Sequence, residues 1–226
     1  MTESDAQLAD RLASIDDRIA AAARQAGRSP EDITRIVVTK FHPASLVEEL
    51  YGLGVRDVGE NRVQEVLEKV VGVGDLSDLR WHFVGQLQTN KARAVRRVAS
   101  VIHSLDRPSL VRALARAMDR TGRRIPCFVQ VDVGEEEQKG GCAPGDLAGL
   151  LEQARGADVP VVGLMCVPPL DIEPAPYFAL LDKLARDNGL AGRSMGMSGD
   201  FETAIMLGAT HVRVGTALFG ERASPL

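Results

Sequence analysis

The sequence predicts an α/β protein that folds as a single (β/α)8 barrel of the TIM type, with an extra helix before the first strand. Two observations support this fold. Short segments rich in β-branched residues alternate with helical segments along the chain. Counting them gives about eight strands, the number found in a closed (β/α)8 barrel. With 226 residues and 45% hydrophobic content the chain can bury one core, so we expect one domain over residues 1–226.

The first element is expected to be a helix over residues 8–25, outside the barrel. Gly27 and Pro30 supply its end. Its apolar residues recur at helical spacing, at Leu8, Leu12, Ile15, Ile19 and Ala22. The first strand is expected at residues 33–39, and Lys40 follows it directly. Pro43 then suits the first turn of a helix that continues to Leu53.

The remaining strands follow at intervals that leave room for a helix between most of them. We expect them at residues 56–58, 80–84, 101–103, 125–133, 161–165, 193–197 and 211–214. A doubly wound open sheet would give a similar local pattern. The sequence contains no GxGxxG fingerprint to support that alternative.

Composition limits the function classes. The formal charge of −4 is expected to be spread along the sequence, with nothing like the concentrated basic footprint of a nucleic-acid binder, so nucleic acid is not an expected partner. Cys127, Cys142 and Cys166 lack CxxC or Cys/His metal spacing, which favours reduced thiols, no metal site and a cytoplasmic location. No segment has the length and apolarity of a membrane span, and residues 1–10 do not resemble a signal peptide.

Lys40 is the first candidate for chemistry, because a barrel places strand C-termini at its active-site face. Strand alternation puts Ile36, Val38 and Lys40 on one face. Burial there would favour a neutral, nucleophilic amine. Taken alone, the segment favours a surface lysine just past a strand, because lysine is seldom fully buried.

A candidate phosphate site lies near the C-terminus. Ser198 is a plausible N-cap for a helix over residues 201–207, whose free backbone N–H groups would suit a phosphate. Gly215 and Thr216 end the final strand, and the loops after strands seven and eight commonly bind phosphate in barrels. An ordinary helix cap and a glycine turn remain equally good explanations.

Three further residues are candidates for the barrel interior or mouth. Arg213 alternates with Val212 and Val214, so it points inward if the valines contact the outer helices. It could meet a ring nitrogen or a carboxylate, or form a structural ion pair. His82 could hydrogen-bond to or stack on a ligand, or be structural. Asn61 lies at the barrel mouth or caps a helix.

A basic group on an expected helix consists of Lys91, Arg93, Arg96 and Arg97. It could attract phosphate-bearing partners, but a solvated helix face is the simpler interpretation.

Several motifs in order resemble the pyridoxal phosphate homeostasis protein family over nearly the whole chain. They are Val38-Thr-Lys40, Gly59-Glu-Asn61, Val63-Gln-Glu65, Trp81-His-Phe-Val-Gly85, Leu87-Gln-Thr-Asn-Lys91, Gly163-Leu-Met165, Ser194-Met-Gly-Met-Ser198 and Val212-Arg-Val-Gly-Thr-Ala-Leu-Phe-Gly220. Thr39, Gln86 and Gly199 depart from the commoner residues of that family.

The resemblance implies a barrel similar to the N-terminal domain of alanine racemase that binds pyridoxal 5′-phosphate (PLP). It implies a Schiff base on Lys40 and phosphate contacts from Ser198, Gly215 and Thr216. It also implies that Arg213 lies near the pyridine nitrogen and that Asn61 and His82 line the cofactor. Met197 is counted with these cofactor-binding residues.

The resemblance further implies a carrier for vitamin B6 homeostasis that lacks robust catalysis, with PLP-dependent apoenzymes as possible recipients. The alternative is a PLP-dependent amino-acid racemase. Racemisation benefits from an acid/base group on each face of the substrate, and two-domain racemases use a second domain or subunit for this. We expect no such domain after Leu226 and therefore a monomer. A third alternative, a phosphate-binding barrel enzyme without PLP, would give Lys40 no special task.

Overall fold

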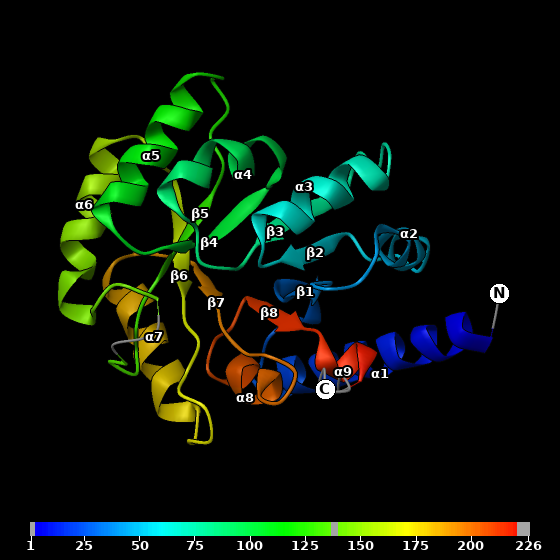
Figure 1. Cartoon of the computed structure of the whole chain (residues 1–226). Helices are drawn as coiled ribbons and strands as arrows, with labels where there is room; N and C mark the ends of the chain where they lie inside the picture. Colours follow the sequence, from blue (N-terminus) through cyan, green and yellow to red (C-terminus); the bar gives the residue numbers. More distant parts are fainter. Residues whose placement is uncertain (1–2, 137–139, 221–226) are drawn as a thin grey trace.

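The computed structural model describes residues 3–136 and 140–220, and in this part of the chain eight parallel strands close into a barrel (Figure 1). Each strand pairs with the next, and β1 pairs with β8 to complete the ring. The strands are β1 Thr34–Val38, β2 Asp57–Glu60, β3 Arg80–Phe83, β4 Val101–Leu105, β5 Cys127–Gln130, β6 Val161–Met165, β7 Gly192–Ser194 and β8 His211–Val214. The barrel prediction is confirmed, and the open-sheet alternative is wrong.

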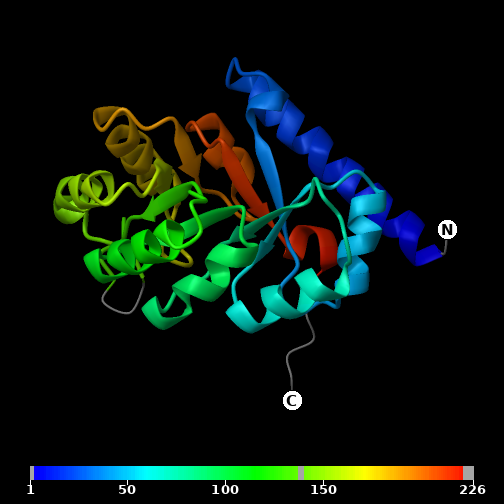
Figure 2. The same cartoon turned by 90° about the horizontal axis from the view of Figure 1, so that it is seen from above.

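Helices follow the strands and cover the barrel from outside, as Figures 1 and 2 show. Those after β1 to β4 are α2 Ala44–Gly52, α3 Val63–Gly72, α4 Ala92–Val98 and α5 Pro108–Asp119. Those after β5 to β8 are α6 Leu147–Gly156, α7 Ala175–Asp187, α8 Phe201–Met206 and α9 Thr216–Phe219. Short 3-10 turns occur at Pro30–Asp32, Thr89–Lys91 and Pro144–Asp146.

The extra helix is α1 Glu3–Gln25, which lies along the outside of the barrel against α8 and α9 (Figure 2). Its regularly spaced residues Leu8, Leu12, Ile15 and Ile19 are buried in the apolar core. The predicted helical spacing therefore marks the face that packs on the barrel. No helix in the described part of the chain is both long and apolar enough to cross a bilayer.

Strand alternation divides the buried residues into two layers. Val37, Val129, Leu164, Val212 and Val214 belong to the apolar layer between the strands and the helices. The residues that alternate with them point into the barrel, where polar groups are common. The inward positions include Asp57, His82, His103, Ser194, His211 and Arg213.

Several expected boundaries need correction. The second strand includes Gly59 and Glu60, which were expected to follow it, and the fourth continues to Leu105. The strands expected at 125–133 and 193–197 are shorter, because pairing along β5 ends at Gln130 and along β7 at Ser194.

Candidate functional site

Lys40 lies in the turn that immediately follows β1, at the C-terminal end of the barrel. Its side chain is partly buried, and among the described residues its amine has no hydrogen-bond or ion-pair partner. The next residue, Phe41, has a φ of 67°, a left-handed conformation that is uncommon for a bulky residue. Such strain persists only where surrounding contacts hold it, and it often marks functional sites.

Contacts from α3 hold this turn in place. The Phe41 N–H donates to Glu65 Oε2 at 2.8 Å, and the Arg62 guanidinium lies 4.6 Å from the centre of the Phe41 ring. The carbonyl of Thr39 accepts a hydrogen bond from Lys69 Nζ at 2.7 Å. The backbone on both sides of Lys40 is therefore tied to the same helix.

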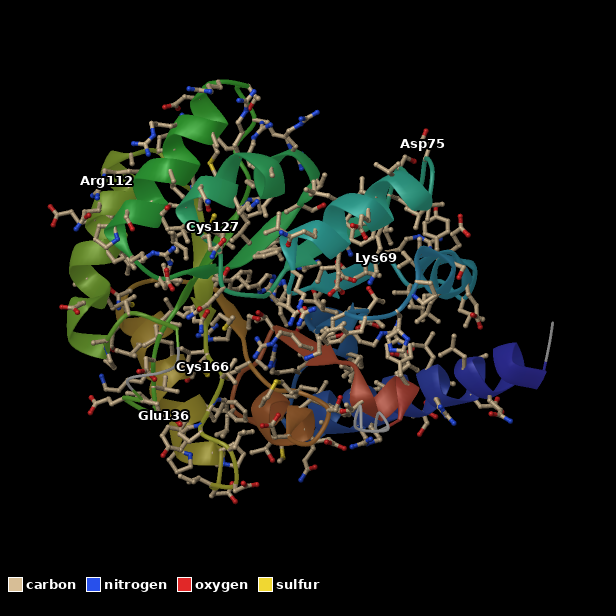
Figure 3. The ribbon with its side chains drawn as sticks, in the orientation of Figure 1. Lys69, Asp75, Arg112, Cys127, Glu136 and Cys166 are labelled. Atoms are coloured by element: carbon tan, nitrogen blue, oxygen red, sulfur yellow. The ribbon has the colours of Figure 1, made fainter. Side chains whose placement is uncertain are left out.

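A buried ion pair between Glu60 and Lys69 also stabilises the Lys40 turn. Lys69, labelled in Figure 3, donates to Glu60 Oε1, which also accepts a hydrogen bond from the Thr39 hydroxyl at 2.6 Å. Glu60 is fully buried, and in the described part of the chain its Oε2 has no hydrogen-bond partner. Burial raises the pKa of Glu60, while the bonds from Lys69 and Thr39 oppose that rise. The sequence analysis missed Lys69, although it is a lysine on the otherwise buried face of α3.

Ser198 and the start of α9 meet beside the Lys40 turn. The Ser198 hydroxyl accepts hydrogen bonds from the N–H groups of Gly215 and Ala217, both at 3.1 Å. Gly215 lies against the end of β1, since a Cβ at this position would be 3.4 Å from the Val38 carbonyl oxygen. The end of β1 just before Lys40 is therefore a neighbour of Gly215, which directly follows the adjacent strand β8.

The expected role of Ser198 as a helix N-cap is wrong. The N-cap of α8 is Asp200, and Ser198 is turned toward α9 instead. Asp200 Oδ1 accepts a hydrogen bond from the Met197 N–H at 2.6 Å, which closes the loop before α8. Met197 is partly buried in that loop, and Thr216 is exposed as the first residue of α9. Ser198 thus caps a different helix from the one predicted.

Arg213 points into the barrel and is 5% exposed. Its guanidinium donates to the Ser194 carbonyl at 2.9 Å, to the Ser194 hydroxyl at 2.7 Å and to the Cys166 carbonyl at 2.8 Å. In the described residues no carboxylate forms an ion pair with it. Burial lowers the pKa of Arg213, so the neighbouring oxygens are needed to stabilise its charge.

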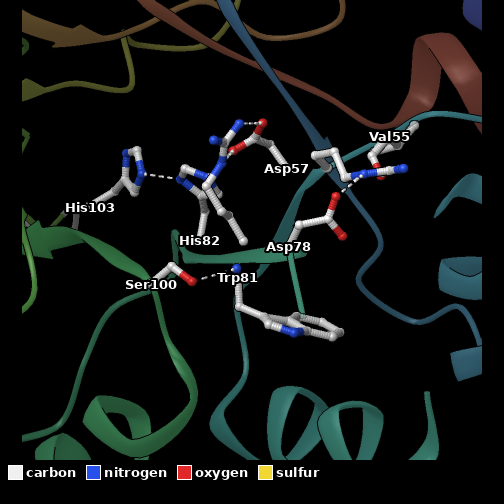
Figure 4. A network of polar contacts seen from close by, with 9 residues as sticks. Val55, Asp57, Asp78, Trp81, His82, Ser100 and His103 are labelled. Atoms are coloured by element: carbon white, nitrogen blue, oxygen red, sulfur yellow. Dashed lines mark hydrogen bonds and ion pairs between the residues drawn. The ribbon is translucent and has the colours of Figure 1, made fainter. Parts of the chain in front are cut away.

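A chain of hydrogen bonds continues from Arg213 through the barrel interior. The Ser194 hydroxyl lies 2.9 Å from His103 Nδ1, and His103 Nε2 lies 2.9 Å from His82 Nδ1. His82 Nε2 lies 2.8 Å from Asp57 Oδ1, as part of the network in Figure 4. One set of tautomers satisfies every link: Ser194 donates to His103, His103 to His82, and His82 to the Asp57 carboxylate.

The far end of this chain is a carboxylate at the start of β2. Burial alone would raise the pKa of Asp57, but hydrogen bonds from His82 and Arg80 outweigh it and lower the pKa to about 2. Asp57 is therefore ionised at neutral pH. Both ring nitrogens of His82 are used within the protein, which leaves only its ring face for a ligand.

Asn61 follows β2 at the barrel mouth. Its Oδ1 is buried and has no hydrogen-bond partner within residues 3–136 and 140–220. Its backbone is pressed against the loop after β3, where a Cβ at Gly85 would lie 2.0 Å from the Asn61 carbonyl oxygen, so only glycine fits there. Among the described residues, Asn61 Oδ1 and the Lys40 amine therefore both lack a partner, as expected for polar groups that bind a ligand.

Besides Lys69, the sequence did not indicate Asp57, His103 and Ser194 as site residues. Strand alternation could have indicated their inward direction, as it did for Arg213. It could not have shown that they touch, because Ser194 and His103 are 91 residues apart. In the described residues, no three His, Cys, Asp or Glu side chains are grouped as a metal site would require.

This geometry defines a class of protein: a (β/α)8 barrel with a lysine after its first strand and a serine–glycine cluster formed by the loops after its last two strands. Residues 11–223 match the family model of the alanine racemase N-terminal domain. The alanine racemase of Clostridium difficile has the same fold, with a TM-score of 0.72 at 16% identity, over 96% of this chain and 57% of the racemase.

More similar proteins narrow the assignment. The pyridoxal phosphate homeostasis protein of Aquifex aeolicus is 41% identical over 223 residues, which cover 94% of this chain and 97% of the relative. That of Pseudomonas aeruginosa is 40% identical, over 95% of this chain and 96% of the relative. The structure of PipY from Synechococcus elongatus with PLP bound is 37% identical, with a TM-score of 0.81, over 94% of this chain and 100% of PipY. The chain belongs to the pyridoxal phosphate homeostasis protein family.

Proposed function

We propose that this protein binds PLP at the C-terminal mouth of its barrel and serves in intracellular vitamin B6 homeostasis. The observation that carries this proposal is that Lys40, whose amine has no partner among the described residues, follows the end of β1, and Gly215 of the Ser198 cluster packs against that end. The family assignment and the PLP-bound structure of PipY support it independently.

The residues present fit such a ligand. A primary amine suits covalent attachment through the PLP aldehyde, so we propose Lys40 as the attachment point. Ser198, Gly215 and Thr216, with Met197 beside them, would hold the phosphate. Asn61 supplies an unpaired acceptor at the mouth, and His82 presents a ring face.

Arg213 would face the pyridine nitrogen in this arrangement. An arginine remains charged at neutral pH, so it disfavours protonation of the ring nitrogen and weakens the electron sink that PLP supplies to catalysts. We therefore propose binding and delivery of PLP in preference to racemisation. The names of the relatives agree with this choice.

We propose further that the protein acts as one domain and as a monomer in the cytoplasm, and that PLP-dependent apoenzymes receive its cofactor. The three cysteines support a reducing location, because all are buried and free. Burial raises the pKa of each thiol to about 12, which keeps them unreactive.

The test is the absorbance spectrum of the purified protein with PLP, before and after borohydride reduction, followed by peptide mass analysis. We expect an adduct on Lys40 that is absent in Lys40→Ala. Lys183→Ala, at an exposed lysine on α7, should keep the adduct. An adduct on another lysine, or none, contradicts the proposal.

A second measurement separates a carrier from an enzyme. The protein loaded with PLP is incubated with single amino-acid enantiomers, and the products are resolved by chiral chromatography. Turnover at about 1 per second or faster would identify a racemase instead.

A further inference from the structure

The charge of this chain is divided unevenly along the sequence, contrary to our expectation. Residues 91–124 contain 10 of the 27 Lys and Arg residues but 2 of the 31 Asp and Glu residues. This segment has a formal charge of +8 in a chain of net charge −4. The segment covers α4, β4 and α5, and the negative excess lies elsewhere.

The fold brings these arginines onto one outer face. Helices α4 and α5 pack side by side on the barrel (Figure 1). Five residues define what we call the α4–α5 arginine surface: Arg93, Arg96, Arg97, Arg116 and Arg120. In the described part of the chain, none of the five forms an ion pair. The two acidic residues of the segment are already used, since Asp106 pairs with Arg107 and Asp119 with Arg124.

Two adjoining hollows lie in this surface. One has a volume of about 160 Å³ and is lined by residues that include Arg116. The other, of about 360 Å³, is lined by residues that include Arg96 and Arg97. Arg93, Ala117 and Arg120 line both, so the two hollows share a wall. The small side chain of Ala117 leaves room between the arginines.

Arg96 supplies an independent observation that points to a ligand. It is 5% exposed, yet its Nε is buried without a hydrogen-bond partner among the described residues. Its Nη2 donates to the Arg123 carbonyl at 3.0 Å. Burial and the nearby charge of Arg123 both lower the pKa of Arg96, so its charge is poorly stabilised by the protein alone. An anion in the larger hollow would supply the acceptor and the opposite charge.

We propose that the α4–α5 arginine surface binds a small phosphate-bearing anion with two charged groups, such as a diphosphate. One guanidinium group can donate two parallel hydrogen bonds to the oxygens of a phosphate. Arg93 and Arg120 line both hollows, so they would contact both phosphate groups of one diphosphate. Concave hollows of this size favour a small molecule over a protein surface. Neither Lys40 nor Ser198 lines these hollows, so this site is separate from the proposed PLP site.

The test uses the full chain saturated with PLP, so that the mouth of the barrel is occupied. Pyrophosphate and ADP are titrated separately at low ionic strength, up to about 10 mM, while backbone amide and arginine Nε–H signals are followed by NMR. We expect saturable shifts in residues 92–98 and 108–119 and at the Arg96 Nε–H. Tighter binding of ADP would identify a nucleotide source, and equal binding a free diphosphate.

Matched variants decide whether the arginines are responsible. Arg93→Gln with Arg120→Gln should weaken pyrophosphate binding at least about tenfold, because each loses charge-assisted hydrogen bonds. Arg112→Gln is the control, since Arg112 is exposed on α5 and lines neither hollow (Figure 3). It should change binding less than about twofold.

Three results would overturn the proposal. They are the absence of saturable shifts, shifts confined to the neighbourhood of Ser198 and Gly215, and binding that the double variant leaves unchanged. Tighter binding of an oligoglutamate peptide than of pyrophosphate would also overturn it, and would identify the surface as a docking site for an acidic protein.

Discussion

Ser194 connects Arg213 by hydrogen bonds to the histidines inside the barrel. Its carbonyl and hydroxyl both accept from the guanidinium, and its hydroxyl also contacts His103. Ser194→Ala removes the hydroxyl from both contacts, so Arg213 loses part of its orientation. We expect PLP affinity to fall about tenfold, the effect of roughly one hydrogen bond to a charged group. Titration of the absorbance change with PLP measures it.

Ser104 offers a matched control for that variant. It is also fully buried, but its Oγ has no hydrogen-bond partner among the residues that the structure describes. Ser104→Ala should leave PLP affinity within about twofold and cost no stability, because no bond is lost. Urea unfolding without PLP tests folding separately. If both variants weaken PLP equally, Ser194 has no specific role in positioning Arg213.

Single residues also show how far the sequence alone leads. The inward direction of Arg213 follows from alternation with two valines, a local property of a strand. Its partners do not follow, because Ser194 and Cys166 come from other strands. Ser198 was assigned to the wrong helix for the same reason. Its position before α8 resembles a cap, but the hydroxyl meets α9 only after β7 and β8 have paired.

At the scale of elements, the pair of Glu60 and Lys69 joins β2 to α3 under the Lys40 turn. Lys69→Met would leave the Glu60 carboxylate buried without its cation. We expect a loss of about 3–5 kcal/mol in the free energy of unfolding, measured with urea. The Lys40 turn should also become less ordered, because Lys69 no longer donates a hydrogen bond to the Thr39 carbonyl.

The control for this prediction is the double variant Glu60→Gln, Lys69→Met. It removes both charges, so it should be more stable than Lys69→Met alone by at least about 1 kcal/mol. If the single and double variants are equally unstable, lost packing of the lysine stem explains the effect and the buried charge does not.

At the scale of the whole molecule, the strand count favoured the barrel, but a doubly wound open sheet gives the same local pattern, and only the pairing of β1 with β8 excludes it. Charge was harder to interpret. The arginines of α4 and α5 are separated in the sequence by β4 and become one surface only when the two helices pack together. The contacts among His82, His103 and His211 could not be predicted from the sequence either. Each lies on a different strand, and they meet only inside the closed barrel.

The acid stability of the whole barrel should depend on these interior histidines. Burial is the main cause that lowers the pKa of His211 to about 4 and the pKa of His103 well below its ordinary value, with His82 and Arg213 also acting against protonation. In the unfolded chain both histidines protonate near pH 6.5. Between about pH 6.5 and pH 4 the unfolded state therefore binds more protons, and the free energy of unfolding must fall as the pH falls. Asp57 adds to this loss only at lower pH, between its unfolded pKa of about 3.8 and its folded value of about 2.

Replacing one histidine should flatten this dependence. In His211→Gln, the loss of unfolding free energy between about pH 7 and pH 4.5 should be smaller than in the wild type by about 1–2 kcal/mol, since His211 is partly exposed and its shift is partly screened. Urea unfolding at both pH values measures the difference, whatever the variant's stability at neutral pH. Lys183→Gln, which removes an exposed ion pair on α7, should keep the slope of the wild type. If the dependence of unfolding free energy on pH is unchanged in His211→Gln, His211 is protonated in the folded barrel. The hydrogen-bonded chain from Asp57 to Arg213 would then lie beside a positive charge that it is not arranged to stabilise.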